Sequence, residues 1–540
     1  MNALVRRYHA LRERVLPAGS VARAVYDRVT WAILRRVRRH VDAVVQRDEL
    51  DPSYARWRTD HAAGRAELHR MRHAASPWWP TMSVIIVAGP GQKRSLLSIE
   101  RQVYSRRQVC TASTLSSALA LATGDFVVFL RTGDELSPDA LWRYAERAAK
   151  GVDDIVYADE DCVDGEGRHH KPFFKPDWSP ELLLSFNYIG NAFAARRSLV
   201  AFQATDRFDL LLQMTETTTR IGHLPHVLYH SHHASAEFAN RHAIEAAVQR
   251  RGRLARVVAE PEGRFRVKYA IEGRPRVAII VPTRDRIELL RTTIESIDGR
   301  STYREFEIIV IDNGSREPAS LEYLSSLQSR HRVLCDPSPF NWSSLNNRAA
   351  LQTNAPLLLF LNNDVEVIAA DWLEALIEHA QHPEVGAVGA KLLYPDGKIQ
   401  HAGVVMGIGG LASHAFRTRL DDGGEYHGLS SVVREYSAVT GACLMTRREV
   451  FEAAGGFDEE LGIAYNDVDF CLRLGARGLR TVYTPYAKLF HYESATRGVG
   501  HPPENEALLV NRWHAQIAND PFYSPNLSLG SEQFDIRTRS

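Results

Sequence analysis

The chain has 540 residues, more than one ordinary hydrophobic core accommodates, so two or three domains are expected. Its composition is globular, with 44% hydrophobic and 24% charged residues, and a formal net charge of +1 gives no general case for nucleic-acid binding. The five cysteines lie far apart without a CxxC pair. That spacing argues against a disulfide framework or a zinc knuckle and favours reduced thiols in the cytoplasm.

The first 50 residues are basic, with 11 arginines against five acidic residues. Apolar residues recur at helical spacing from Leu4 to Val15 and from Ile33 to Val44. A basic amphipathic helix can contact an anionic membrane surface, and the alternative is an ordinary helix packed on the main body. No apolar run approaches about 18 residues, and the arginines precede no long apolar segment, so we expect neither a spanning helix nor a secretory signal.

Short apolar runs alternate with helix-like segments after residue 80, as is typical of an α/β protein. In the first half we expect buried strands at 83–87, 125–130 and 154–157. Residues 236–251 read as a helix, and residues 265–271 alternate like a half-buried strand. We therefore expect three segments before the second half: a basic helical region at 1–76, a first domain at 77–235, and a linker of helix and strand at 236–275.

The pattern restarts at Val277, and three successive strands end in polar, turn-forming residues. Ligands of open α/β sheets collect at the carboxyl ends of strands, so these three ends predict a binding crevice. The residues of interest in these turn-forming strand ends are Pro282, Thr283 and Asp285, then Asp312 and Asn313, then Asn362, Asn363 and Asp364.

The two halves resemble one another, which predicts related domains in tandem. The first half has Arg131, Gly133 and Arg207 where the second has Asn362, Asp364 and Asp467. A proline precedes a histidine near each end: Pro225 and His230, then Pro485 and His491. The first copy is shorter, so we expect it to lack the strand that precedes Asp312. We also expect it to bind no nucleotide sugar and to serve as a scaffold or acceptor platform.

Sugar transfer from a nucleotide diphosphate needs a cation on the leaving diphosphate and a general base on the incoming hydroxyl. Asp364 can bind the cation, and His491 is a candidate second ligand, although a lone histidine is more often structural. Asp467 and Asp469 precede a helical run, so one can cap that helix and the other can face the crevice as the base.

The remaining candidates would hold the nucleotide sugar. Asp312 can accept hydrogen bonds from the nucleobase or ribose, and Thr283 and Asp285 can line the same pocket. Arg348 and Arg497 can offset the diphosphate charge, although a loop arginine is more often simply solvated. The glycine-rich run at 407–412 lacks an acidic residue at the spacing of a dinucleotide site, so a nicotinamide site is not expected.

These motifs resemble bacterial family 2 glycosyltransferases, in particular the tandem-domain group that builds O-antigen and other surface polysaccharides. The resemblance covers about residues 80–530 and is dense at 279–285, 312–315, 360–367, 399–410, 438–458 and 466–498. It implies a GT-A fold, a nucleotide-diphosphate sugar donor, a divalent cation (Mg²⁺ or Mn²⁺) and inversion at the anomeric carbon.

Carried over by motif, the resemblance makes Asp467 the catalytic base, Asp364 the metal-binding aspartate, His491 the residue that completes the metal site, and Asp312 the nucleotide-binding acid. Pro282, Thr283, Asp285, Asn313, Arg348, Asn362, Asn363 and Arg497 complete the expected donor site. The family pattern usually has acidic residues at the positions of Asn313, Asn362 and Asn466. These amides resemble the rhamnosyltransferase-like branch, which favours dTDP-rhamnose.

We therefore predict an α/β protein with two tandem GT-A-like domains, the first degenerate, after an N-terminal helical segment. The catalytic domain is expected at 276–500, and a C-terminal helix and tail covering it at 501–540. The expected function is sugar transfer to a glycan or lipid-linked glycan in the cytoplasm, with peripheral contact at the inner face of the membrane through residues 1–50 and no nucleic-acid partner. The alternative is a non-catalytic saccharide-binding or assembly module.

Overall fold

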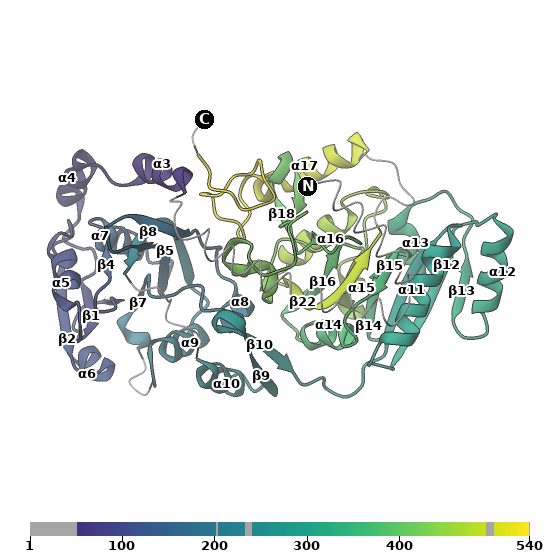
Figure 1. The fold of residues 1–540 in the computed structure, drawn as a ribbon, viewed down its shortest axis with the longest axis horizontal. Helices are drawn as coiled ribbons and strands as arrows, with labels where there is room; N and C mark the ends of the chain where they lie inside the picture. Colours follow the sequence, from purple (N-terminus) through teal and green to yellow (C-terminus); the bar gives the residue numbers. More distant parts are fainter. Residues whose placement is uncertain (1–50, 201–203, 233–239, 493–501, 539–540) are drawn as a thin grey trace, which may run out of the picture. The chain divides into compact units, whose positions relative to one another are not determined.

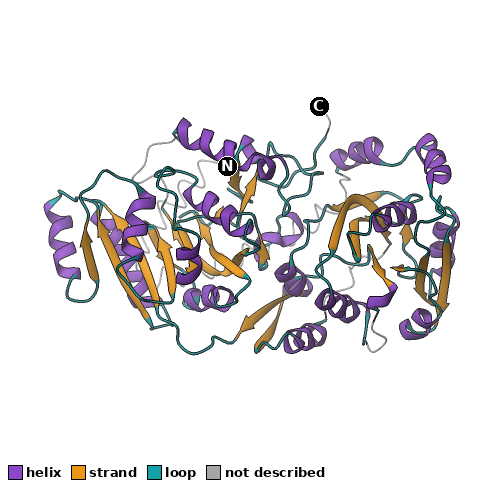
Figure 2. Cartoon of the chain, turned by 180° about the vertical axis from the view of Figure 1, so that it is seen from behind, coloured by secondary structure: helices purple, strands orange, loops and turns teal. Residues whose placement is uncertain are grey.

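The computed structural model describes residues 51–200, 204–232, 240–492 and 502–538, so the basic segment 1–50 lies outside the described residues. The chain divides into two compact units, Met1–Ala55 and Arg56–Ser540. Two β-sheets with surrounding helices make up most of the second unit (Figure 1, Figure 2). Among the described residues, no helix has both the length and the apolar character needed to cross a membrane.

Residues 82–231, which we call the first module, carry the first sheet. Its strands run in the order β2-β1-β3-β7-β5-β8-β4, with β6 paired to β5. They are β1 (Met82–Val87), β2 (Arg107–Ala112), β3 (Phe126–Phe129), β4 (Glu135–Leu136), β5 (Ile155–Val163), β6 (His169–Phe173), β7 (Phe193–Arg196) and β8 (Ile221–Ser231). The helices are α5 (Gln92–Glu100), α6 (Leu115–Ala120), α7 (Ala140–Ala149), α8 (Pro180–Ser185) and α9 (Arg207–Thr217), preceded in the sequence by α3 (Pro52–His61) and α4 (Arg65–Ala74).

Residues 277–491, the second module, carry a sheet in the order β13-β12-β11-β14-β21-β16-β22-β15. These strands are β11 (Val277–Thr283), β12 (Phe306–Asp312), β13 (Arg332–Cys335), β14 (Leu357–Leu361), β15 (Val365–Val367), β16 (Val385–Leu393), β21 (Cys443–Arg447) and β22 (Arg480–His491). Two short strands, β17 (Ile399–His401) and β20 (Arg434–Glu435), pair with β16 and β22. The helices are α11 (Ile287–Arg300), α12 (Pro318–Leu327), α13 (Trp342–Ala350), α14 (Trp372–Ala380), α15 (Arg448–Ala453) and α16 (Asn466–Gly475).

The two sheets share an order of seven strands, as two related domains in tandem would. Strand for strand, β2-β1-β3-β7-β5-β8-β4 matches β12-β11-β14-β21-β16-β22-β15, with the same parallel and antiparallel pairings. The expectation that the first copy lacks a counterpart of β12 is wrong, because β2 lies parallel to β1 as β12 lies parallel to β11. The first copy lacks the acid instead: β2 ends at Ala112 and β12 at Asp312.

Strand β14 lies at the centre of the second module and is buried on both faces. It runs parallel to β11 and antiparallel to β21. Leu357, Leu359 and Leu361 belong to the core cluster that also contains residues of α11 and α14. Phe360 packs on the other side against Phe457, with ring centroids 4.7 Å apart. Burial of each such side chain contributes about 1.5–3 kcal/mol, which fixes the strand and its polar end in place.

The segments outside the two sheets are α10 (Arg241–Arg250), the hairpin of β9 (Ala255–Glu260) and β10 (Arg264–Tyr269), the hairpin of β18 (Val404–Met406) and β19 (Ala412–His414), and α17 (Pro503–Ala518). The C-terminal tail contacts both modules, whereas the sequence predicted that it covers the second. The Asp177 N–H donates to the Pro521 carbonyl over 2.7 Å, and Asn526 Nδ2 donates to Asp159 Oδ2 over 3.1 Å. In the second module, the rings of Phe416 and Phe534 stack 4.2 Å apart.

A buried ion network joins the modules. Arg480 of β22 lies 2.6 Å from the Glu435 carboxylate and 3.3 Å from the carboxylate of Glu181 on α8. Both carboxylates are almost fully buried. Burial alone would raise the pKa of Glu181, but the cationic groups around it, Arg480 foremost among them, together lower this pKa below its ordinary value. Burial dominates at Glu435, whose pKa is raised. The arginine is therefore required to neutralise charge that water cannot reach.

Candidate functional site

The polar ends of β11, β12 and β14 meet at one edge of the second sheet, as the sequence predicted. Asn363 Nδ2 donates a hydrogen bond to Thr283 Oγ1 over 2.9 Å, which joins the end of β14 to that of β11. The Asn313 N–H donates to the Thr283 carbonyl over 2.9 Å, which joins β12 to the same point. Parallel strands bring their carboxyl ends to one edge, and so residues up to 80 positions apart form a single surface.

Asp364 and His491 lie side by side at this edge. His491 ends β22, which pairs with β15 so that His491 faces Val365, the residue after Asp364. His491 Nε2 lies 3.1 Å from Asp364 Oδ1 and 3.2 Å from Asn362 Nδ2. Both Asp364 and His491 are buried. The structure therefore brings together the two residues that were predicted to bind a cation.

The surroundings of this pair fit a metal ion. His491 Nδ1 lies 2.6 Å from Gln400 Oε1, so Nδ1 donates, and the lone pair on Nε2 faces Asn362 Nδ2 and Asp364 Oδ1. No described residue donates a hydrogen bond to Asp364 Oδ1, although this atom is buried. A carboxylate oxygen facing an imidazole lone pair is unfavourable unless a proton or a cation lies between them. The sequence did not predict a role for Gln400. Its place within residues 399–410, one of the segments where the family resemblance is dense, was the only indication.

Asp467 occupies the start of α16, next to the strand ends. Its Oδ2 accepts a hydrogen bond from the Gly441 N–H over 2.7 Å, and its Oδ1 accepts from the Val468 N–H over 2.8 Å. The next residue, Ala442, accepts from the Asn362 N–H over 3.1 Å. One short loop thus contacts both Asp467 and the end of β14. Asp467 is partly exposed, and the ordinary hydrogen bonds to its carboxylate leave lone pairs for a further donor.

Asp469 has a structural environment. Its side chain is fully buried and accepts from Arg473 Nε over 2.7 Å and from Trp513 Nε1 over 2.9 Å. The bond from Trp513 attaches the C-terminal helix α17 to α16. Of the two aspartates, only Asp467 therefore combines partial exposure with a place at the strand ends.

Several residues predicted to bind the donor also hold loops of the site. Asp285 has a left-handed backbone, with φ of 53°, and its Oδ1 accepts from the Arg316 and Glu317 N–H groups. These bonds lower the pKa of Asp285, the Glu317 N–H having the largest effect. Asp312 Oδ1 accepts from the Ser315 N–H over 2.8 Å. Pro282 is buried within β11.

Asn313 and Arg348 converge on the loop at 336–338. Asn313 Nδ2 donates to the Asp336 and Ser338 carbonyls, both over 2.8 Å. Arg348 is about half exposed and lies 2.6 Å from Asp336 Oδ2. Its charge is therefore already paired, although it remains accessible. Arg497 lies outside the described residues.

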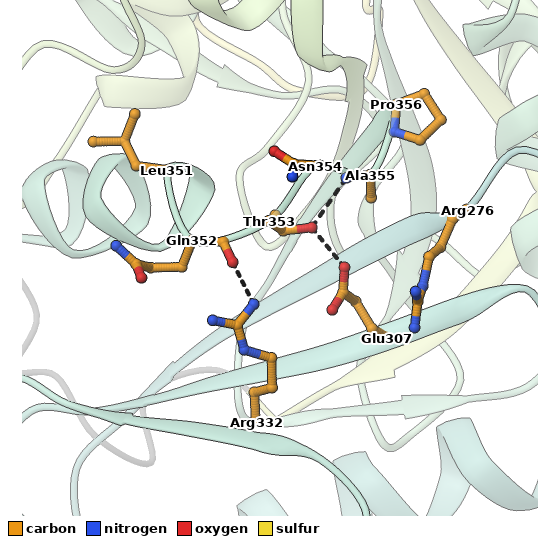
Figure 3. Close-up of a pocket in the computed structure, with 9 residues that line it drawn as sticks. All are labelled: Arg276, Glu307, Arg332, Leu351, Gln352, Thr353, Asn354, Ala355 and Pro356. Carbon is orange, nitrogen blue, oxygen red and sulfur yellow. Dashed lines mark hydrogen bonds between the residues drawn. The ribbon is translucent and has the colours of Figure 1, made fainter.

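A polar pocket of about 470 Å³ lies at the opposite end of the same strands (Figure 3). Its lining includes Arg276 just before β11, Glu307 near the start of β12, and Arg332 at the start of β13. The Thr353 hydroxyl donates to Glu307 over 2.5 Å within it. None of the predicted site residues that the structure describes lines this pocket. It is therefore separate from the edge where Thr283, Asp364 and His491 meet.

The first module lacks the corresponding groups. Glu135 faces His230 across β4 and β8, and Glu366 faces Phe490 across β15 and β22. Because Glu135 is the counterpart of Glu366, His230 corresponds to Phe490, and the next residue, Ser231, corresponds to His491. The sequence comparison, which matched His230 with His491, is therefore off by one residue at this position. Arg131 and Gly133 occupy the places of Asn362 and Asp364, as predicted.

Comparison with known proteins finds one family and several relatives that match parts of the chain. Residues 278–455 match the family described as Glycosyl transferase family 2. The chain is 40% identical over 454 residues to the O-antigen biosynthesis protein RfbC of Myxococcus xanthus, covering 79% of this chain and 36% of that protein. It is 31% identical over 136 residues to an N-acetylglucosaminyl-diphospho-decaprenol L-rhamnosyltransferase of Mycobacterium tuberculosis, covering 23% of this chain and 44% of the enzyme. The chain thus spans about a third to a half of the length of these curated relatives.

Two solved structures are similar to parts of the chain. One is GalNAc-T7 with UDP, GalNAc and Mn²⁺, at 17% identity and a TM-score of 0.39, covering 50% of this chain and 55% of that one. The other is the mannosyltransferase PcManGT from Pyrobaculum calidifontis with GDP-Man and Mn²⁺, at 16% identity and a TM-score of 0.32, covering 45% and 70%.

Proposed function

Because the chain carries a glycosyl transferase family 2 domain at residues 278–455, we propose that its second module transfers a sugar from a nucleotide diphosphate to a hydroxyl of a glycan or lipid-linked glycan. The observation that carries this proposal is the pairing of buried Asp364 with His491 beside Asp467 and the strand ends. Cell-surface polysaccharide synthesis and dTDP-rhamnose as donor are the finer parts of the proposal, supported by the O-antigen protein and the rhamnosyltransferase among the relatives.

In the proposed reaction, Asp467 accepts the proton of the acceptor hydroxyl as its oxygen attacks the anomeric carbon. The bond from that carbon to the diphosphate breaks at the same time, and the diphosphate leaves with the electron pair. A single displacement of this kind inverts the anomeric centre. A Mg²⁺ or Mn²⁺ ion, when bound, would stabilise the charge on the leaving diphosphate, and Asp364 and His491 are the residues that would hold it.

The nucleotide would bind across the ends of β11 and β12, where Thr283 and Asp312 present polar groups. Arg348 is close enough to the surface to meet the diphosphate if it exchanges its pairing with Asp336. Arg497 and the membrane contact of residues 1–50 remain part of the proposal as sequence-based expectations, as do a cytoplasmic location and the domain boundaries. The first module is proposed to act as a scaffold or acceptor platform without a donor of its own.

A screen of nucleotide sugars for metal-dependent release of the nucleotide tests the proposal. We expect turnover of at least one donor in the presence of Mn²⁺ or Mg²⁺ and loss of the metal stimulation in Asp364→Ala. Saccharide binding without turnover of any donor, in a protein that retains its fold, would instead support the non-catalytic module.

Replacing Gln400 tests how the metal site is positioned. We expect Gln400→Ala to raise the metal concentration needed for half-maximal activity by about 10–100-fold, because Gln400 fixes the tautomer and orientation of His491. The activity at saturating metal should fall much less. Gln352→Ala, which changes a glutamine at the opposite end of the strands, serves as the control. An unchanged metal requirement in Gln400→Ala would contradict this role.

A further inference from the structure

The first module contains a cluster of two histidines and one aspartate that lies outside the site described above. Asp161 is on β5, His169 is on β6 and His230 is on β8. Strand β5 pairs with both β6 and β8, and Asp161 lies directly opposite His230 in the register. His169 Nδ1 is 2.8 Å from Asp161 Oδ2, and His230 Nδ1 is 2.6 Å from Asp161 Oδ1.

We propose that Asp161, His169 and His230 bind a divalent transition-metal ion such as Zn²⁺. Their ligand atoms, a carboxylate oxygen and one nitrogen from each ring, all lie within 4.8 Å of one another. The Asp161 side chain is fully buried, and the two histidines keep 19% and 14% of their side-chain surface exposed. An ion could therefore enter from the histidine side and meet a carboxylate already shielded from water.

The ligand types select the class of ion. Two imidazoles and one carboxylate suit Zn²⁺ or a neighbouring transition metal better than Mg²⁺, which prefers oxygen ligands. Three protein ligands leave one position of a tetrahedral site for water. Cys162 follows Asp161 directly on β5, but its sulfur is not among the ligand atoms that lie within 4.8 Å of one another, so its thiol is not expected to be the fourth ligand.

The cluster is not a remnant of the sugar-transfer site. The register matches His230 with Phe490 and places Ser231 where the second module has His491. Because strand residues alternate between faces, His230 and His491 lie on opposite faces of their sheets. In the first module Asp161 of β5 pairs with His230, and in the second module Leu393 of β16 pairs with Phe490. Leu393 is therefore the counterpart of Asp161. The second module therefore has no equivalent set among these strand positions.

A metal ion here would join the β5–β6 hairpin to β8. Strand β6 continues from His169 to Pro172 and Phe173, which contact the second module. The Phe173 ring stacks on His427 at 4.2 Å, and the Pro172 carbonyl lies 3.0 Å from His427 Nε2. The proposed ion would thus fix the strand that carries this contact.

The alternative is a hydrogen-bonded cluster without a metal, in which each imidazole donates its Nδ1–H to Asp161. Metal binding would require each ring to carry its proton on Nε2 instead. Co²⁺ and Zn²⁺ added alone separate the two cases. The full chain carrying Asp364→Ala is the starting protein, because it removes the aspartate of the second module from the measurement.

We expect this protein to retain one Co²⁺ per chain after equilibrium dialysis and to show the visible absorption of a tetrahedral Co²⁺ site. Zn²⁺ should displace the Co²⁺ and raise the Tm, since an ion that binds the folded state stabilises it. His169→Ala and His230→Ala should each weaken Co²⁺ binding by at least about tenfold. Asp161→Asn, which keeps the size of the side chain, should do the same.

His331→Ala is the matched control, because His331 pairs with Asp298 at 3.0 Å without a second histidine. It should leave Co²⁺ binding unchanged. Absence of retained Co²⁺ and Zn²⁺ in the folded starting protein would overturn the proposal, as would equal binding by the starting protein and a folded His230→Ala variant. Each variant's circular dichroism and metal-free Tm show whether it has folded.

Discussion

Replacing Asp467 with asparagine is expected to lower kcat by about 10²–10⁴-fold, the usual contribution of a general base. The amide keeps the shape of the side chain, and its oxygen can still accept the bond from the Gly441 N–H. It has no useful proton affinity, however, so the acceptor hydroxyl would lose its base. Donor binding should change little. The measurement is the rate of metal-dependent nucleotide release and acceptor glycosylation at saturating substrate.

Asp469→Asn provides the matched comparison two residues away. Asp469 is fully buried and paired with Arg473, so this change should lower the Tm while leaving residual activity in the folded fraction. A fall in kcat for Asp467→Asn, together with a lower Tm but residual activity for Asp469→Asn, would distinguish a chemical role of Asp467 from a structural role of Asp469. Full activity in Asp467→Asn would show that another group accepts the proton.

Arg480→Ala is expected to destabilise the protein by about 3–5 kcal/mol, because it leaves buried carboxylates without their cation. Glu181 and Glu435 belong to different modules and both depend on this guanidinium. The predicted consequence is a lower Tm and looser association between the modules. Thermal unfolding gives the first quantity, and limited proteolysis between residues 240 and 275 reports the second.

Lys398→Ala is the control for Arg480, because Lys398 forms an ion pair with Asp396 in which both side chains are about half exposed. Exposed pairs contribute about 0–1 kcal/mol, so the Tm of this variant should hardly move. Arg480→Met tests the charge separately from the bulk of the side chain. Similar Tm values for Arg480→Met and the unchanged protein would contradict the importance of the buried charge.

The central strands could be predicted from the sequence, and the edge strand could not. Residues 357–361 are apolar throughout because β14 is covered on both faces. Strand β2, in contrast, lies at the edge of its sheet and reads Arg-Gln-Val-Cys-Thr-Ala, with Cys110 its only fully buried residue. A strand with one neighbour and little burial needs no apolar run, so its pattern gave no signal.

In the candidate site, too, some features could be predicted from the sequence and others could not. The strand ends that carry Thr283, Asp312 and Asp364 could be placed at one edge, because parallel strands impose that geometry. The partners of His491 depended on pairings that no local pattern records. Gln400 comes from a strand of three residues, and β22, the strand that ends in His491, pairs irregularly with β16. Such irregularities shift which side chains share a face.

The conformation of Gly133 bears on whether the first module could carry an aspartate where the second module has Asp364. Gly133 stands where the second module has Asp364, and its φ of 94° is left-handed, a conformation that Asp364 does not share. A residue with a Cβ is strained there by about 1–2 kcal/mol. Gly91, close beside it, is also left-handed. Replacement of Gly133 by aspartate would therefore give a strained carboxylate on a differently shaped loop. A single substitution at Gly133 would therefore not reproduce in the first module the backbone geometry that Asp364 has in the second.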